Sequence, residues 1–196
     1  DVMVPNKTIW SGSIPLSATN SWLVGNARVD RTTTNIENGV LFPYLRSVEL
    51  YHCLADRSKI ESSFASRKWL TPLRTRSYSL NGWLNGANPG DGTPSRFVRA
   101  SQLVHPPPAQ VFVFLDEHEN TIDDGAFGLF PEPDARWINT PADRHGQGGN
   151  LSYADGHAAR LTWRWPKRPA DLEWMKSAAN DRDLADLRDL QQTIPQ

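Results

Sequence analysis

Apolar residues gather most strongly in one short run of the chain, residues 111–115, whose sequence is Val-Phe-Val-Phe-Leu. Five consecutive strand-favouring residues between polar neighbours predict a strand that is covered on both faces. The prolines at 106–108 lead into it. Because each fixes φ and lacks an N–H donor, they predict a stiff extended connector. Residues 76–84 favour a second strand, and residues 85–95, dense in Gly, Pro, Asn and Asp, predict a surface loop.

Two extended runs flank the dipeptide Asp155-Gly156, which predicts a β-hairpin. A two-residue turn there would set apolar residues opposite polar ones. A bulged loop over 154–156, with Gly156 in the left-handed region, pairs Leu151 with Ala159 instead. A one-residue shift in strand pairing turns every side chain to the other face of the hairpin. We therefore expect the pairing that places the apolar side chains together on one face. That face then carries Leu151, Tyr153, His157, Ala159, Leu161 and Trp163.

The rest of the chain predicts smaller elements around this sheet. Residues 1–36 are polar and irregular, and residues 40–45 favour one or two helical turns. Residues 48–53 favour an extended segment that leads into a polar turn at 55–58.

The C-terminal segment, residues 169–192, has helical character. Pro169 suits a first helical turn, and the acidic residues beside it favour the positive end of a helix dipole. Asn180 predicts a break with a new N-cap. The apolar stripe consists of Leu172, Met175 and Ala179, followed by Leu184, Leu187 and Leu190. The whole pattern predicts one α+β domain over residues 1–196, with an antiparallel sheet, long irregular loops and C-terminal helices.

The composition argues against a disordered, a membrane-spanning and a strongly charged protein. A chain of 196 residues can bury one sizeable core, and eight Trp argue against disorder. Lys+Arg 21 against Asp+Glu 22 gives a net charge of −1, so no overall field favours nucleic acid or an anionic membrane. No apolar run reaches the 18 residues or so that span a bilayer.

The single cysteine, Cys53, rules out an intrachain disulfide and a CxxC metal knuckle. A lone cysteine is usually a small buried hydrophobic residue, and no other motif supports a catalytic thiol. Serine-nucleophile and phosphate-loop motifs are absent from the sequence, so we expect no catalytic residues.

An acidic stretch follows the strand at 111–115 and offers oxygen ligands for a hard cation such as Ca²⁺. The alternative is a solvated turn whose side chains cap the local backbone. The candidate ligands are Asp116, Glu117, Asn120, Asp123 and Asp124.

Histidine and tryptophan residues supply two further candidate sites. His118, His145 and His157, with Asp116 and Asp155, are of the types that hold Zn²⁺ or Fe²⁺. The alternative makes His157 a packing residue and His145 a cap of the Gly-rich loop that follows it. Trp163 and Trp165 are candidates for stacking on a sugar ring, and the alternative places the tryptophans in the core.

His145, nine intervening residues and then Asp155-Gly156 form a pattern that resembles the H-X9-DG proteins, a family associated with prepilin-type processing and related to type II secretion pseudopilins. Other stretches fit that family in order, although Leu54 stands where the family usually has proline. They are Gly-Val-Leu-Phe-Pro-Tyr-Leu from residue 39, Tyr-His-Cys-Leu-Ala-Asp from 51, Ser-Tyr-Ser-Leu-Asn-Gly-Trp from 77 and Phe-Leu-Asp-Glu-His-Glu from 114.

The resemblance implies a pilin-like globular head whose N-terminal helix is absent, because residues 1–5 resemble the point just after that helix. It implies a structural subunit of a type II secretion pseudopilus or type IV pilus-like filament, with other pilin or pseudopilin subunits as partners. The location would be periplasmic or at the cell surface, with membrane anchoring only through the missing helix. Calcium sites occur in pseudopilin heads, which favours Ca²⁺ at the acidic stretch. The alternatives are a carbohydrate-binding module, with or without Ca²⁺, and third a metal-dependent hydrolase using His145, Asp155 and His157.

Overall fold

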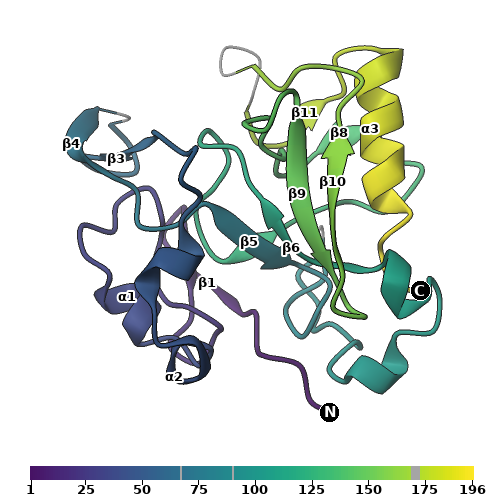
Figure 1. Ribbon diagram of the computed structural model, residues 1–196, viewed down its shortest axis with the longest axis horizontal. Helices are drawn as coiled ribbons and strands as arrows, with labels where there is room; N and C mark the ends of the chain where they lie inside the picture. Colours follow the sequence, from purple (N-terminus) through teal and green to yellow (C-terminus); the bar gives the residue numbers. More distant parts are fainter. Residues whose placement is uncertain (67, 90, 169–172) are drawn as a thin grey trace.

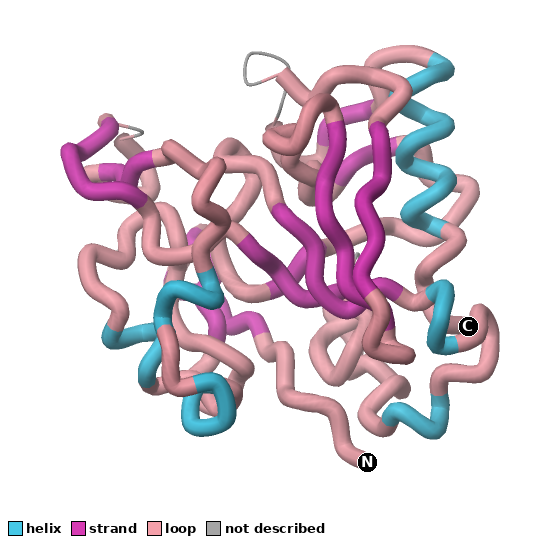
Figure 2. The backbone as a smooth tube through the Cα atoms, viewed as in Figure 1, coloured by secondary structure: helices cyan, strands magenta, loops and turns pink. Residues whose placement is uncertain are grey.

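The computed structural model describes residues 1–66, 68–89, 91–168 and 173–196. Short helices and strands alternate with long loops, and the chain is an α+β protein (Figures 1 and 2). The N-terminal elements are β1 (Thr8–Ser11), β2 (Ile14–Ser17), α1 (Thr34–Glu37), α2 (Phe42–Leu45), the 3-10 helix η1 (Val48–Tyr51), β3 (Lys59–Glu61), β4 (Trp69–Leu73) and β5 (Tyr78–Asn81). The later elements are η2 (Ala100–Gln102), η3 (Pro108–Gln110), β6 (Phe112–Asp116), β7 (Ala126–Phe127), β8 (Arg136–Trp137), β9 (Gly148–Tyr153), β10 (Ala158–Thr162), β11 (Lys176–Ser177) and α3 (Asp181–Gln191).

A five-stranded sheet of order β10-β9-β6-β5-β7 forms the centre of the molecule. Its pairs are antiparallel except for β5 and β7, which run parallel. β6 lies in the middle and supplies side chains to both cores, Phe112 to one and Phe114 to the other. The prediction of a strand covered on both faces is confirmed, one residue later than the apolar run. The strand predicted within 76–84 is present as β5, and the described residues of 85–95, which exclude residue 90, form no named helix or strand.

The β9–β10 hairpin has the predicted bulged register. Leu151 pairs with Ala159, and the Tyr153 N–H donates to the His157 carbonyl over 2.9 Å. Gly156 has φ +96°, a backbone conformation that favours glycine. The Tyr153 and His157 rings stack with centroids 4.3 Å apart on the shared face. The observed strand pairing is thus the one that places the apolar side chains on one face of the hairpin.

Helix α3 packs on one face of this sheet (Figure 1). Leu187 and Leu190 are fully buried in its core cluster, beside Leu151 of β9. The predicted N-cap is confirmed, because the Asn180 side chain accepts hydrogen bonds from the N–H groups of Arg182 and Asp183. Among the described residues no helix is long and apolar enough to cross a membrane.

The helix expected before Asn180 is wrong where the structure describes it. Residues 169–172, which include Pro169 and Leu172, lie outside the described residues. Beyond them Met175 has φ +58°, and Lys176–Ser177 forms β11, paired with β8. The Trp174 indole donates to the Thr121 carbonyl over 2.8 Å. Backbone pairing and this tertiary anchor outweigh a short helical pattern, because propensity alone is a weak preference.

Two expectations for the N-terminal third are also wrong. Within residues 1–36, β1 and β2 pair as a hairpin around Gly12, whose φ is +64°. Residues 48–51 form the 3-10 helix η1 instead of an extended segment. η1 places the buried Tyr51 ring against Trp22, stacked at 5.8 Å, and this packing belongs to a second core that local pattern did not reveal. The helical turn predicted at 40–45 is present as α2.

Lys167 holds α3 to the sheet with a buried charge. Its Nζ lies 2.5 Å from Asp183 Oδ1 and 2.9 Å from Asp186 Oδ2, both on α3. The ammonium also lies 4.9 Å from the centroid of the Trp137 ring. All three charged side chains are buried, and the only other cation in contact with either carboxylate, among the described residues, is the half-exposed Arg164, 3.3 Å from Asp186 Oδ1.

Lys167→Met is expected to lower the free energy of unfolding by about 3–5 kcal/mol, because it leaves the buried Asp183 without a cation and Asp186 with only the exposed Arg164. Urea unfolding followed by circular dichroism measures the change. Lys176→Met, on an exposed strand residue, is the control and should leave stability nearly unchanged. Equal stability of both variants would contradict this account of how α3 is held.

Candidate functional site

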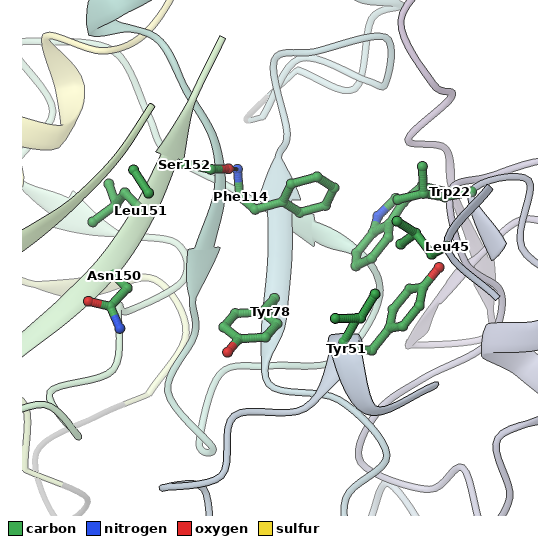
Figure 3. A pocket seen from close by; sticks show the side chains of 11 residues that line it. Trp22, Leu45, Tyr51, Tyr78, Phe114, Asn150, Leu151 and Ser152 are labelled. Atoms are coloured by element: carbon green, nitrogen blue, oxygen red, sulfur yellow. Dashed lines mark hydrogen bonds between the residues drawn. The ribbon is translucent and has the colours of Figure 1, made fainter. Parts of the chain in front are cut away.

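An apolar groove crosses the sheet face opposite α3. Its volume is about 290 Å³, and it lies between the α2–η1 segment and strands β9 and β10. Figure 3 shows Trp22, Leu45 and Tyr51 on one side, with Phe114 and Tyr78 between them and the β9 residues. The lining consists of Trp22, Leu41, Leu45, Leu50, Tyr51, Tyr78, Phe114, Asn150, Leu151, Ser152 and Ala158. Such a groove can receive an apolar side chain or segment.

The side of the groove made by α2 and η1 carries exposed apolar side chains, which we call the α2–η1 rim. It consists of Tyr44, Leu45, Leu50 and Leu54, with 84%, 39%, 59% and 88% of their surfaces exposed. Leu45 and Leu50 line the groove, and Tyr44 and Leu54 are exposed apolar residues of the same eleven-residue segment. Patches of this kind mark interaction surfaces, whereas single exposed leucines do not.

Three potential metal ligands converge below the rim, and we call them the Cys53 cluster. Cys53 follows η1, Asp116 ends β6, and His145 precedes β9. Cys53 Sγ lies 3.4 Å from His145 Nε2, which lies 3.1 Å from Asp116 Oδ2. The three donor atoms lie within 4.8 Å of one another, and among the described residues this is the one such group of three or more. Asp116 is fully buried and His145 is partly exposed.

The cluster does not have the geometry of a catalytic triad. In a triad the nucleophile and the orienting carboxylate use opposite nitrogens of the imidazole, so that a proton can pass between them. Here the thiol and the carboxylate both face Nε2. Three potential ligand atoms within 4.8 Å of one another are instead typical of side chains that share one ion.

Charged groups around the cluster fix its position. Arg144 pairs with Asp116 Oδ1 and lies 3.2 Å from Asp56 Oδ2. The Cys53 N–H donates to Ser77 Oγ over 3.0 Å, and that hydroxyl donates to Asp56 over 2.7 Å. Burial raises the pKa of Asp116 to about 6, although the charges of Arg144 and His145 oppose the rise.

Tyr78 links the cluster to the groove. Its ring lines the groove, and its hydroxyl hydrogen-bonds to Cys53. Burial and then the neighbouring Cys53 and Asp116 raise the pKa of the phenol, so Tyr78 stays protonated at neutral pH. The cluster and the groove are therefore adjacent parts of one region.

The five candidate calcium ligands take separate places. Asp116 belongs to the Cys53 cluster, and Glu117 Oε1 accepts hydrogen bonds from Thr121 and Asn139. Asp123 Oδ1 accepts the Asp124 N–H, and Asp124 accepts from the Thr8 hydroxyl and the Ala126 N–H. The Asn120 N–H donates to the His118 ring over 3.1 Å. Each of these residues thus makes its own hydrogen bonds to different neighbours. Calcium binding at this stretch stays a prediction.

Most of this acidic stretch is buried, which differs from the solvated turn considered from sequence. Glu117, Asp123 and Asp124 are buried around Arg76. The Arg76 guanidinium donates to the carbonyls of Asp123, over 2.7 Å, and of Asp124. One buried cation therefore faces three buried carboxylates, which favours protonation of some of them.

The candidate histidines do not meet. His118 is buried apart from the others, and burial lowers its pKa. His145 precedes the first residue of β9 and Asp155 follows its last, so the six residues of that strand separate them by about 20 Å. His157 lies at the tip with Asp155, with 2.6 Å between its Nδ1 and Oδ1. The trio proposed for a hydrolase is thus not assembled.

Sequence reasoning found Asp116 and His145 but assigned Cys53 only a packing role. Cys53 is indeed buried, yet it completes the cluster. The available signal was that Cys53 and His145 both fall within the stretches that carry the family resemblance. Their sequence separation of 92 residues hides their contact from any local pattern.

The two tryptophans proposed for sugar stacking are placed differently from each other. Trp163 is 2% exposed in the core, and its indole donates to the Ala142 carbonyl over 2.8 Å. That ring therefore has no free face for a sugar, which corrects the expectation for Trp163. Trp165 is half-buried beside Trp137 and Lys167.

No family model, no curated protein and no solved structure matches the chain. The resemblance to H-X9-DG proteins therefore rests on the sequence motifs alone.

Asp123→Asn is expected to make the free energy of unfolding less dependent on pH. Burial, and then repulsion from Asp124 and Glu117, raises the pKa of Asp123 well above 3.8 in the folded chain. The folded state then holds a proton that the unfolded chain releases. This carboxyl therefore costs stability as the pH rises from about 3.8 through its folded-state pKa. Asparagine keeps the Oδ1 acceptor without that cost, so the variant should be the more stable chain at about pH 8.

Urea unfolding of parent and variant at about pH 5 and pH 8 measures this effect. Asp91→Asn is the control, because hydrogen bonds from the Thr93 backbone and side chain lower the pKa of this exposed carboxyl. Because this carboxyl is ionised in both the folded and the unfolded chain at pH 5 and above, its substitution should leave the difference in stability between pH 5 and pH 8 unchanged. Parallel profiles for the parent and Asp123→Asn would contradict the prediction.

Proposed function

We propose that this chain is the globular head of a pilin-like or pseudopilin-like structural subunit that acts by packing against other subunits. The observation that carries the proposal is the apolar groove beside the α2–η1 rim. A protein that only had to stay dispersed in water would gain nothing from such a surface. In an assembly, a neighbouring subunit covers it.

The hairpin motif supports an architectural role for the residues that carry the family resemblance. Asp155 accepts the His157 N–H over 3.1 Å, and Gly156 takes the left-handed conformation that the bulged turn requires. His145 lies at the opposite end of β9, where Arg160 of β10 donates to its carbonyl over 2.8 Å. Asp-Gly therefore shapes the turn, and the His145 backbone closes the open end of the same hairpin.

The family resemblance supplies the remainder of the proposal. By that resemblance, the proposed subunit would lie at the periplasmic side of a membrane or at the cell surface, and an apolar helix before residue 1 would anchor it. The groove and its rim face away from α3, so neighbouring heads can reach them without disturbing the core that α3 covers.

The codons upstream of Asp1 in the encoding gene test the class of protein directly. We expect a short basic leader, a cleavage site and an apolar helix of about 20 residues. An initiator codon directly before Asp1, or another folded domain there, would overturn the pilin-like assignment.

Leu50→Glu is expected to weaken self-association of the chain at least about tenfold, which corresponds to about 1.4 kcal/mol. Leu50 lines the groove and is 59% exposed, so a charge there meets the partner without entering a core. Sedimentation velocity over a concentration series measures the association. Val104→Glu, at a 61% exposed position outside the groove lining, is the matched control. A parent chain that stays monomeric throughout would contradict the groove as a contact between subunits.

A further inference from the structure

The Cys53 cluster brings together three segments that are distant in sequence. Cys53, Asp116 and His145 are separated by 63 and 29 residues, yet their donor atoms lie within 4.8 Å. A thiol, a carboxylate and an imidazole are the three side-chain types that bind Zn²⁺. Burying such groups is costly unless each finds a partner. Arg144 pairs with Asp116 Oδ1, and the Tyr78 hydroxyl bonds to Cys53, whereas Asp116 Oδ2 and Cys53 Sγ both contact His145 Nε2.

The distances fit a tetrahedral ion. Zn–S, Zn–N and Zn–O bonds of about 2.0–2.3 Å at tetrahedral angles place ligand atoms roughly 3.3–3.6 Å apart. Two sides of the triangle, 3.4 Å from Cys53 Sγ to His145 Nε2 and 3.1 Å from Nε2 to Asp116 Oδ2, are already near these values. The third side, from Cys53 Sγ to Asp116 Oδ2, is no longer than 4.8 Å.

The residues around the cluster hold the ligands in place. Arg160 donates to the carbonyls of His145 and Gly146, at 2.8 Å and 2.6 Å, and so fixes the loop that presents the imidazole. Arg144 occupies the other oxygen of Asp116, which leaves Oδ2 facing His145. Ser77 holds the Cys53 backbone. Such supporting contacts are a normal part of metal sites.

The local charge suits a dication. Arg144 is the cation in contact with Asp116, and it also contacts the carboxylates of Asp56 and Glu119. Deprotonation of Cys53 adds a further negative charge. Carboxylates therefore outnumber the guanidinium around the cluster, and the thiolate favours Zn²⁺ over the hard cations Ca²⁺ and Mg²⁺.

The site is accessible from solvent. His145 has a quarter of its side chain exposed, and Tyr78 connects the cluster to the groove seen in Figure 3. Three protein ligands leave a fourth position, which water can fill.

We propose that Cys53 Sγ, Asp116 Oδ2 and His145 Nε2 bind one Zn²⁺ ion per chain. The ion ties the segment after η1 to the end of β6 and to the start of the β9–β10 hairpin, and so sets the distance between the rim and the sheet. This site is independent of the proposed assembly role, because its donors are the chain's own and need no partner.

Calorimetric titration of the chelator-treated chain with Zn²⁺ alone tests the proposal. We expect one ion per chain, release of protons on binding and a higher melting temperature. With Co²⁺ as the probe, we expect the thiolate charge-transfer band and the intense visible bands of a tetrahedral site. Absence of saturable Zn²⁺ binding by the folded chain would overturn the site.

Matched variants assign the ligands. Cys53→Ser should abolish the Co²⁺ thiolate band, and His145→Ala should abolish stoichiometric Zn²⁺ binding. Arg160→Ala removes a positioning residue and should weaken binding about 10- to 100-fold. His157→Ala removes the exposed histidine at the far tip of the hairpin and should leave binding unchanged.

Circular dichroism establishes which variants are folded before titration. Should His145→Ala fail to fold, the conservative Cys53→Ser variant and the Co²⁺ spectrum of the parent still decide the outcome. Unchanged Zn²⁺ affinity in a folded Cys53→Ser or His145→Ala chain would overturn the proposal. So would saturable Ca²⁺ binding by the parent with no response to Zn²⁺.

Discussion

Burial of acidic side chains at the end of the central strand is the constraint on which the rest of this structure depends. β6 ends with Asp116 and passes directly into Glu117, and both are fully buried. Removing carboxylates from water is costly, so the fold must supply buried hydrogen-bond donors and cations. Arg144 meets Asp116, and Arg76 binds the carbonyls of Asp123 and Asp124. These contacts join the loops after β4, β6 and β8.

The same requirement explains why the groove and the Cys53 cluster adjoin. Asp56 follows η1 and pairs with Arg144, so the charge network that stabilises β6 also holds the α2–η1 segment near the sheet. The segment stays far enough away to leave the groove open, and Tyr78 forms part of both features.

The residues of the sequence motif, His145 and Asp155-Gly156, have two different roles at opposite ends of the hairpin. Asp155 and Gly156 shape a turn, whereas His145 lies about 20 Å away at the other end of β9 and contributes its ring to the cluster. The nine intervening residues contain one strand and the bend that precedes it. In this chain the length of that strand accounts for most of the spacing between His145 and Asp155, which do not meet at a shared ligand.

Local pattern in the sequence determined the strand at β6, the register of β9 and β10, the turn at Gly156 and the N-cap at Asn180. Each depends on residues near one another in the chain, where periodicity and turn chemistry act directly. Tertiary structure alone decided the β1–β2 hairpin, η1, β11 and the burial of the acidic stretch. It also decided the meeting of Cys53 with His145, 92 residues away. Those features depend on which distant segments pack together, and a linear pattern of apolar and polar residues does not encode that choice.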